Sequence, residues 1–249
     1  MSAGSTPLHG VTIVVTRARH QNDALRDTLT GLGARVVEVP LLAIVEPDDE
    51  GRDRDTVLQR FHEFDWVVVT SPNGADRVAP FVRAAVAAGD HDRFPKFAVV
   101  GRATQRSLGA SAALTADPAR AEVLVEMFPS GTGEVLVVQG NLADETVAVG
   151  LAHKGWNVTK VVAYRTVKVA PTDAQRQSVG DADVLLLASA SAASAWHDAF
   201  GTATPEVVVA IGPSTLKSAT ALGMHVSDVA DDQSIDGLVE ATIRACALR

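Results

Sequence analysis

The chain has 249 residues, of which 47% are hydrophobic and 21% are charged, and this is the composition of a globular protein. Its formal charge of −8 makes a nucleic-acid partner unexpected, because proteins that bind nucleic acids commonly carry a basic surplus. A single cysteine, Cys246, excludes an intrachain disulfide, and the sequence shows neither a secretory signal nor an apolar run long enough for a membrane span. We therefore expect a cytoplasmic protein without a membrane partner.

Eight short runs of apolar, mostly β-branched residues predict strands that are buried on both faces. In chain order they are Val11–Thr16, Val36–Val39, Trp66–Thr70, Phe97–Val100, Val135–Val138, Val158–Ala163, Val184–Leu187 and Val207–Ile211. Amphipathic segments separate most of these runs. Asp23–Gly33 is predicted as a helix that ends at Gly33, and Asp236–Ala247 closes the chain in the same way. Strands that alternate with helices predict an α/β fold with parallel sheets.

Three segments of the first half recur in the same order in the second half. The aligned pairs are Gly33 with Gly155, Asp65 with Asp183, Ser71 with Ser189, Gly101 with Gly212 and Thr104 with Thr215. This order favours two similar α/β units, and a single doubly wound domain of regular βα units is the alternative. The repeat alone suggests a boundary near residue 125. Two polar segments, Glu46–Asp55 and Ala170–Asp183, are predicted as a charged surface loop and a linker.

Six turns that follow predicted strands are rich in Ser, Thr, Asn and Gly. They are Thr16-Arg17, Thr70–Gly74, Gly101–Thr104, Gln139–Asn141, Ser189–Ser191 and Gly212–Thr215. Each turn opens a helix whose first N–H groups lack partners, and the helix dipole there favours an anion by about 0.3–1 kcal/mol. Any one of these turns is explained as a simple helix cap, but the set favours a cleft that binds several carboxylates or phosphates.

Four further side chains are candidates for such a cleft. Arg17, Arg102 and Arg165 lie in or just after strand ends and are either carboxylate partners or solvated surface residues. Tyr164 is the chain's only tyrosine and either donates a hydrogen bond into the cleft or packs at a hinge. The seven histidines show neither HxH nor HExxH spacing, and no dinucleotide or P-loop motif is present, so neither a metal nor a nucleotide is expected.

An ordered set of segments resembles the uroporphyrinogen-III synthase family. The segments are DWVVVTSPNGADRVAPF, AVVGRAT, GWNVTKVVAYRTV, AIGPSTLKSATALG and SIDGLVEA, and they run over nearly the whole chain. The resemblance implies a lyase of heme biosynthesis. Such an enzyme cyclises hydroxymethylbilane, a linear tetrapyrrole with eight carboxylates, to uroporphyrinogen III, with loss of water and inversion of ring D. It implies no cofactor, no metal and no partner other than this small-molecule substrate.

The resemblance also implies the architecture. Two flavodoxin-like parallel-sheet domains would flank a cleft and be joined by a two-segment linker, in a monomer. Domain 1 would comprise residues 1–40 and 167–249, and domain 2 would comprise residues 43–164. This division replaces the boundary near residue 125 that the repeat alone suggests, because the chain would cross between the domains twice.

Carried over residue by residue, the resemblance makes Tyr164 the catalytic residue that assists departure of the hydroxyl. The substrate-binding residues that it implies are Arg17, Ser71, Asn73, Gly101, Arg102, Thr104, Gln139, Gly140, Ser189, Ser191, Gly212, Ser214 and Thr215. Two turns depart from the family pattern. Ala188–Ser191 stands where Thr-Ser-Pro is frequent, and Gln139–Asn141 lacks an arginine that many members carry nearby.

Two other functions remain as alternatives. A two-lobed module of the same fold could bind an anionic ligand, as a sensor, without catalysing a reaction. A sugar-phosphate isomerase also uses Ser- and Thr-rich turns on α/β sheets, and it needs a catalytic Glu or His beside such a turn. Glu145 and His197 are the nearest candidates for that role, and neither has a counterpart in the other half of the chain.

Overall fold

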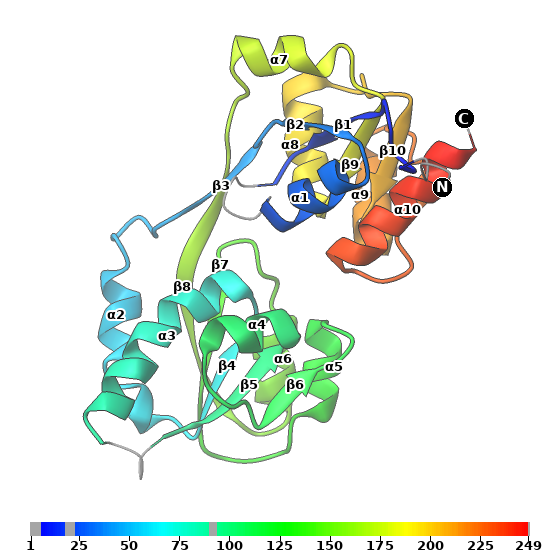
Figure 1. The fold of residues 1–249 in the computed structure, drawn as a ribbon. Coiled ribbons are helices and arrows are strands. Elements are labelled where there is room, and N and C mark those ends of the chain that lie inside the picture. The colour runs from blue at the N-terminus through cyan, green and yellow to red at the C-terminus, as the bar shows by residue number, and fades with distance from the viewer. Residues whose placement is uncertain (1–5, 18–22, 90–93, 249) are drawn as a thin grey trace. The chain divides into compact units, whose positions relative to one another are not determined.

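The computed structural model describes residues 6–17, 23–89 and 94–248 (Figure 1). The chain divides into two compact units. Unit 1 comprises Met1–Ala43 and Val167–Arg249, and unit 2 comprises Ile44–Thr166. Within the described ranges, no helix is both long and apolar enough to cross a membrane.

Unit 1 contains a five-stranded sheet in the order β11-β10-β9-β1-β2, and all four neighbouring pairs are parallel. The strands are β1 (Thr12–Val15), β2 (Arg35–Glu38), β9 (Val184–Leu187), β10 (Val207–Ala210) and β11 (Asp228–Val229). The helices are α1 (Asp23–Gly31), α7 (Asp173–Val179), α8 (Ala190–Phe200), α9 (Pro213–Ala221) and α10 (Ile235–Ala247). One core cluster packs the sheet with α1 and α10, and a second packs it with α8 and α9.

Unit 2 contains a six-stranded sheet in the order β3-β8-β7-β4-β5-β6. The strands are β3 (Leu42–Val45), β4 (Trp66–Val69), β5 (Lys96–Val100), β6 (Leu114–Ala116), β7 (Glu134–Gly140) and β8 (Asn157–Lys168). The helices are α2 (Arg52–Leu58), the 3-10 helix Phe61–Glu63, α3 (Pro72–Ala87), α4 (Arg102–Leu108), α5 (Ala121–Met127) and α6 (Thr146–His153). From β8 to β6, each strand pairs in parallel with the next.

The chain passes between the units inside two strands. The first boundary falls between Ala43 and Ile44, within β3, and the second falls between Thr166 and Val167, within β8. These two strands are neighbours at one edge of the unit 2 sheet, and Figure 1 shows β8 as the long strand that leads from unit 2 back to unit 1. Residue 125 lies inside α5, well within unit 2.

The central strands of both units, β1, β4, β7, β9 and β10, are buried on both faces, as the apolar runs predict. In β4, Val67 and Val69 join the core cluster that includes residues of α3, whereas Trp66 and Val68 join the cluster that includes residues of α5 and α6. A strand covered by helices on both faces has no solvent side, so its sequence shows no polar alternation. The structure therefore confirms the predicted α/β fold with parallel strands, and all eight predicted strands are present.

Two of the residue pairs that the sequence repeat aligns make the same contacts in the two units. Asp65 Oδ2 accepts a hydrogen bond of 2.8 Å from the backbone N–H of Glu134, and Asp183 Oδ2 accepts one of 2.8 Å from Thr12 N–H. Each carboxylate thus joins the start of one strand to the start of its neighbour. Ser71 and Ser189 are the N-caps of α3 and α8, with extended backbones. The repeat therefore corresponds to shared local structure.

The strands β3, β6 and β11 and the helices α2, α5 and α7 were not predicted. β6 and β11 have three and two residues, which is too short for a clear pattern of apolar residues. β3 has four, as many as the predicted β1, and its apolar run Leu42–Val45 was overlooked. The prediction that Glu46–Asp55 and Ala170–Asp183 are irregular is wrong in part, because α2 begins at Arg52 and α7 spans Asp173–Val179. A capping box between Thr172 and Gln175 starts α7. The helix was missed because its residues are mostly polar.

The turn that connects α6 to β8 depends on Gly155. Its φ is +95°, and an added Cβ would lie 2.5 Å from the carbonyl oxygen of Gly131. Gly89 also has a positive φ, of +79°, but a Cβ there would meet nothing within 4 Å. Gly89→Ala should therefore lower the free energy of unfolding by about 1–2 kcal/mol through backbone strain alone.

Gly155→Ala should lower the free energy of unfolding by at least about twice as much, because it adds a clash with backbone that a side chain cannot relieve. Chemical denaturation of the two variants and the parent protein measures the difference. Equal losses in both variants would show that Gly131 is not a close neighbour of Gly155 in solution.

Candidate active site

The sheet of unit 2 brings five of the expected site residues to one edge. Ser71 follows β4, Gly101 follows β5, Gln139 and Gly140 end β7, and Tyr164 lies near the end of β8. Because β8, β7, β4 and β5 are consecutive parallel neighbours, their carboxyl ends lie along the same edge of the sheet. This is the edge where α/β sheets bind ligands.

Ser71 joins the tyrosine to the start of a helix. Its Oγ accepts the N–H of Gly74 at 3.2 Å, which caps α3, and lies 3.0 Å from the phenolic oxygen of Tyr164. Tyr164 is only 9% exposed, so its ring is fixed in the protein rather than free in solvent. The phenol is therefore held beside the positive end of the α3 dipole. Asn73, the second residue of α3, is half-buried at the same helix end.

The ring of Tyr164 lies directly against Gly140. A Cβ at position 140 would come within 2.6 Å of Cζ and 2.8 Å of the phenolic oxygen. The backbone of Tyr164 is also joined to the residue after Gly140, because Asn141 N–H donates to Tyr164 O at 3.2 Å. The resemblance predicts that Gly140 binds substrate. In the structure, the open side of Gly140 packs against the ring of Tyr164. The neighbouring Gln139 is 6% exposed.

The turn after β5 carries Gly101, Arg102 and Thr104. Gly101 has a φ of +85°, and a Cβ there would lie 2.6 Å from Ala119 Cβ, so glycine is needed for both conformation and space. Thr104 is 1% exposed and its hydroxyl donates to Val100 O at 2.7 Å. Arg102 is largely exposed and pairs with Asp117 at 3.2 Å.

Unit 1 brings a matching group to the carboxyl ends of β1, β9 and β10. Ser189 caps α8 by accepting Ala192 N–H at 3.0 Å, and its Oγ lies 3.0 Å from Ser191 Oγ. Arg17, just after β1, is half-buried, and burial lowers the pKa of its guanidinium. Ser214 is exposed in the first turn of α9.

Thr215 differs from its counterpart Thr104 in one respect. It is also 1% exposed, but its buried hydroxyl has no hydrogen-bond partner among the residues that the structure describes. The backbone before the two threonines also differs, because Gly212 is extended at φ 175°, whereas Gly101 has a φ of +85°. A buried hydroxyl without a partner costs about 1–3 kcal/mol, so a ligand that supplies the partner would recover that free energy.

The candidate arginines Arg102 and Arg165 are each paired with a carboxylate of their own unit. Arg102 pairs with Asp117, and Arg165 pairs with Asp48. Ion pairs this exposed contribute about 0–1 kcal/mol to stability, so a ligand carboxylate can replace the internal partner at little cost. Both arginines therefore remain available to an anionic ligand.

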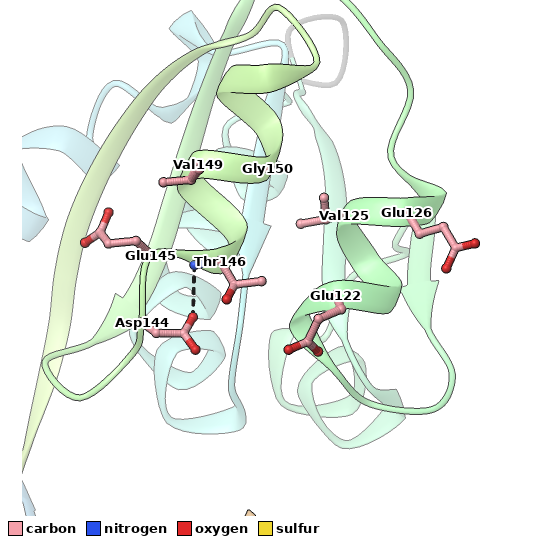
Figure 2. A pocket seen from close by; sticks show the side chains of 8 residues that line it. All are labelled: Glu122, Val125, Glu126, Asp144, Glu145, Thr146, Val149 and Gly150. Carbon is pink, nitrogen blue, oxygen red and sulfur yellow. Dashed lines mark hydrogen bonds between the residues drawn. The ribbon is translucent and has the colours of Figure 1, made fainter.

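A hollow of about 590 Å³ between α5 and α6 contains none of the expected site residues. Figure 2 shows Val125 of α5 pointing toward α6, and Asp144 accepting the N–H of Thr146 at 2.9 Å. Four acidic residues line the hollow, namely Glu122, Glu126, Asp144 and Glu145. Such a surface repels a polycarboxylate, so this hollow is not the substrate site.

The two residues named for a sugar-phosphate isomerase are engaged elsewhere or lie apart from the strand ends. Glu145 forms an exposed ion pair with Lys160 at 2.6 Å. His197 lies in the last turn of α8, at the opposite end of that helix from the capping Ser189. Glu145 is the N-cap residue of α6, after the Gln139–Asn141 turn, but its carboxylate is paired with Lys160, and His197 lies at the far end of α8 from the capping turn, so the geometry does not favour the isomerase.

The family model described as uroporphyrinogen-III synthase HemD matches residues 23–240. The chain belongs to the uroporphyrinogen-III synthase family. A chloroplastic uroporphyrinogen-III synthase of Oryza sativa subsp. japonica is 30% identical over 254 residues, which cover 94% of this chain and 80% of that protein. A uroporphyrinogen-III synthase of Synechococcus elongatus is 30% identical over 167 residues, which cover 64% of this chain and 62% of that protein.

Solved structures of the family share the fold. A mutant uroporphyrinogen III synthase of Thermus thermophilus superposes with a TM-score of 0.65 at 17% identity, covering 96% of this chain and 100% of that one. Uroporphyrinogen-III synthetase of Helicobacter pylori gives a TM-score of 0.61 at 15% identity, covering 96% and 99%. These two comparisons bear on the α/β architecture, and the family model and the plant enzyme establish the family.

The contact between Tyr164 and Gly140 can be tested by one methyl group. Gly140→Ala would place Cβ 2.6–2.9 Å from the tyrosine ring, so the ring must move. We expect the free energy of unfolding to fall by about 1–3 kcal/mol and formation of uroporphyrinogen III to fall with it. Denaturation and an activity assay measure the two effects.

Gly31→Ala is the matched control, because a Cβ at Gly31 would meet nothing within 4 Å. It should leave both the free energy of unfolding and the activity nearly unchanged. A fully active Gly140→Ala variant would contradict the close packing of Tyr164 on Gly140.

Proposed function

We propose that the chain cyclises hydroxymethylbilane to uroporphyrinogen III with loss of water and inversion of ring D, and that Tyr164 is the catalytic residue. Family membership supports the reaction. The observation that supports the residue is the position of the phenol, which lies 3.0 Å from the capping Ser71 at the start of α3. A non-catalytic anion-binding module of the same fold is the competing function.

The proposed chemistry asks little acid–base strength of the protein. The electron pair of the adjacent pyrrole nitrogen expels the terminal hydroxyl, and the C–O bond breaks. The Tyr164 hydroxyl passes its proton to the departing oxygen, which leaves as water, and the tyrosinate regains a proton from the carbon that is deprotonated when the macrocycle closes. The substituted carbon of ring D then attacks the electron-poor carbon, and a spiro intermediate rearranges before the macrocycle closes. Holding the flexible chain so that this carbon attacks is the larger catalytic task.

We propose that the helix N-termini at the carboxyl ends of the strands, in both sheets, bind the carboxylates of the bilane. The residues concerned are Ser71, Asn73, Gly101, Arg102, Thr104, Gln139 and Gly140 in unit 2, and Arg17, Ser189, Ser191, Gly212, Ser214 and Thr215 in unit 1. Backbone N–H groups at helix starts bind anions without requiring a basic surface. Such a site is compatible with a formal net charge of −8.

We further propose that the two units are the two domains of the family fold, each flavodoxin-like. In unit 1 the strand order, numbered in chain order within the unit, is 2-1-3-4-5, which is the flavodoxin-like order. In unit 2 the strands β8-β7-β4-β5-β6 repeat the pattern once β7 and β8 are matched with β1 and β2. The enzyme is proposed to act as a monomer, without a cofactor and without nucleic-acid or membrane partners.

Isomer analysis tests the reaction itself. Hydroxymethylbilane is generated in situ, the protein is added, and the oxidised products are separated into type I and type III isomers by chromatography. We expect type III to dominate. Only type I, the product of spontaneous closure, together with measurable bilane binding, would show that the chain is the non-catalytic module.

Tyr164→Phe tests the catalytic role, because it removes only the hydroxyl. We expect kcat for type III formation to fall by roughly 10- to 100-fold. The free energy of unfolding should fall by only about 1 kcal/mol, since one hydrogen bond to Ser71 is lost. Steady-state kinetics and denaturation measure the two. An unchanged kcat would reduce Tyr164 to a packing residue.

Thr215→Val and Thr104→Val distinguish a hydroxyl held for substrate from one that stabilises the fold. Thr215→Val removes a buried hydroxyl that has no partner in the part of the chain that the structure describes, so we expect the free energy of unfolding to stay the same or rise while KM increases. Thr104→Val removes the 2.7 Å hydrogen bond to Val100 O and should lower the free energy of unfolding by about 1 kcal/mol. Equal destabilisation, with KM unchanged for Thr215→Val, would rule out the substrate role.

A further inference from the structure

Arg54 is a buried arginine in a segment whose sequence looks like a solvated loop. It lies in α2 and is 8% exposed. Its Nε donates to Asp55 Oδ1 at 2.7 Å, and its Nη1 donates to a carboxylate oxygen of Glu46 and to the backbone oxygen of Ala163 at 2.9 Å. A charge is buried only where it is paired and hydrogen-bonded, so these contacts hold the guanidinium in one place.

The charges of this cluster are mutually supported. Burial raises the pKa of Glu46, but hydrogen bonds from Arg54 and Arg77 outweigh it, and the pKa lies below its usual value. Burial lowers the pKa of Arg54, and the hydrogen bonds to Asp55 and Glu46 outweigh that effect in turn. Both groups are therefore charged near neutral pH, and the hydrogen bond to Ala163 O comes from a full guanidinium cation.

The backbone oxygen that Arg54 binds belongs to an irregular point of β8. Along β7 and β8, Gln139 pairs with Val162, but the next residue, Gly140, pairs with Tyr164. Ala163 is the extra residue, and the register shifts by one at this point. Bulges of this kind bend a strand and change the direction of a side chain, often beside an active site.

The register shift decides on which face of the sheet Tyr164 lies. In a regular strand, successive side chains alternate, so Tyr164 would share the face of Val162, which is 41% exposed. Instead Val161, Ala163 and Tyr164 all belong to the core cluster that includes residues of α3. The extra residue has thus moved the tyrosine to the α3 side, where its hydroxyl meets Ser71.

Arg54 is also joined to Tyr164 by a second route. Glu46 accepts a hydrogen bond of 2.9 Å from Arg77 Nη2, and Arg77 lies on α3, whose N-cap is Ser71. The Arg54 guanidinium therefore contacts β8, the strand of Tyr164, directly. It contacts α3, the helix that Ser71 caps, through the carboxylate of Glu46. Both ends of the Ser71–Tyr164 hydrogen bond are held by the same cluster.

The turn before α2 is shaped around this guanidinium. Gly51 has a φ of +83°, and a Cβ there would lie 2.3 Å from Nη2 of Arg54 and 2.6 Å from its Cζ. No L-amino acid with a side chain fits this turn while Arg54 keeps its position. The sequence thus provides both the arginine and the space that it needs.

We propose that Arg54 is a positioning residue for the reaction: by holding the Ala163 carbonyl at the register shift in β8, it keeps the Tyr164 hydroxyl on the α3 side of the sheet, beside Ser71. This inference rests on the catalytic role proposed for Tyr164. The side chain of Arg54 does not itself contact substrate in this account, and it acts through the strand.

Arg54→Lys tests the inference, because an ammonium keeps the charge but cannot supply the fork of donors that reaches Asp55, Glu46 and Ala163 together. We expect kcat to fall by about tenfold or more with little change in KM, since a small displacement of a catalytic group is costly. In a Tyr164→Phe background, the same substitution should change kcat less than about twofold, because the group that it positions is already gone.

The single tyrosine supplies a readout that does not depend on activity. In protein labelled with 13C in the tyrosine ring, Tyr164 is the one labelled residue. We expect its ring signals to shift in Arg54→Lys. Arg244→Lys is the matched control in unit 1. Arg244 likewise binds two carboxylates, those of Asp228 and Asp231, and the backbone oxygen of Val229. Because these contacts all lie within unit 1, Arg244→Lys should leave the Tyr164 ring signals and kcat unchanged.

Unmoved ring signals in Arg54→Lys, or an equal fold-loss of kcat with and without the Tyr164 hydroxyl, would overturn the positioning role. A full rate in Tyr164→Phe alone would instead overturn the catalytic role of Tyr164, and the ring signals would still report on Arg54. Should Arg54→Lys fail to fold, Gly51→Ala keeps the arginine but displaces its guanidinium. The same shift of the tyrosine signals is expected there, and its absence counts against the proposal.

Discussion

The packing of the Tyr164 ring on Gly140 is the contact on which the rest of the site depends. A Cβ at position 140 would lie within 2.6 Å of the ring, so the contact requires glycine. It also requires the one-residue register shift between β7 and β8, which turns the tyrosine toward α3. From that position the hydroxyl reaches Ser71, and Ser71 in turn caps α3. The Tyr164 phenol, a helix N-terminus and two strand ends are thereby fixed as one arrangement.

The protein combines an acidic surface with an edge built to receive anions. Four carboxylates line the hollow between α5 and α6, where a polycarboxylate would be repelled. At the carboxyl ends of the strands, serine and threonine side chains and helix N-termini replace them. Neutral donors and the helix dipole attract carboxylates over short distances only, so the formal net charge of −8 does not prevent binding. The distribution of charge is thus consistent with the proposed binding of carboxylates at the strand ends rather than in the hollow.

Local patterns in the sequence predicted the parallel strands well, because strands covered on both faces carry apolar runs such as Val135–Val138. They also located the caps, since Ser71 and Ser189 stand where apolar runs end. The register shift at Ala163 and the burial of Arg54 could not be predicted. Both arise from contacts between residues far apart in the chain, and Arg54 has the same sequence surroundings as the exposed Arg52. The grouping of candidate residues into a site likewise rests on the resemblance to a family, not on periodicity.

The most direct test of this account is a nuclear Overhauser measurement on protein with labelled tyrosine and glycine. Tyr164 is the only tyrosine, so every ring signal belongs to it. We predict strong contacts between its ring protons and the α-protons of Gly140, since the ring is the nearest neighbour of that glycine's open side. A ring that instead shows contacts to the side chain of Val162, and none to Gly140, would place Tyr164 on the other face of the strand and contradict the account.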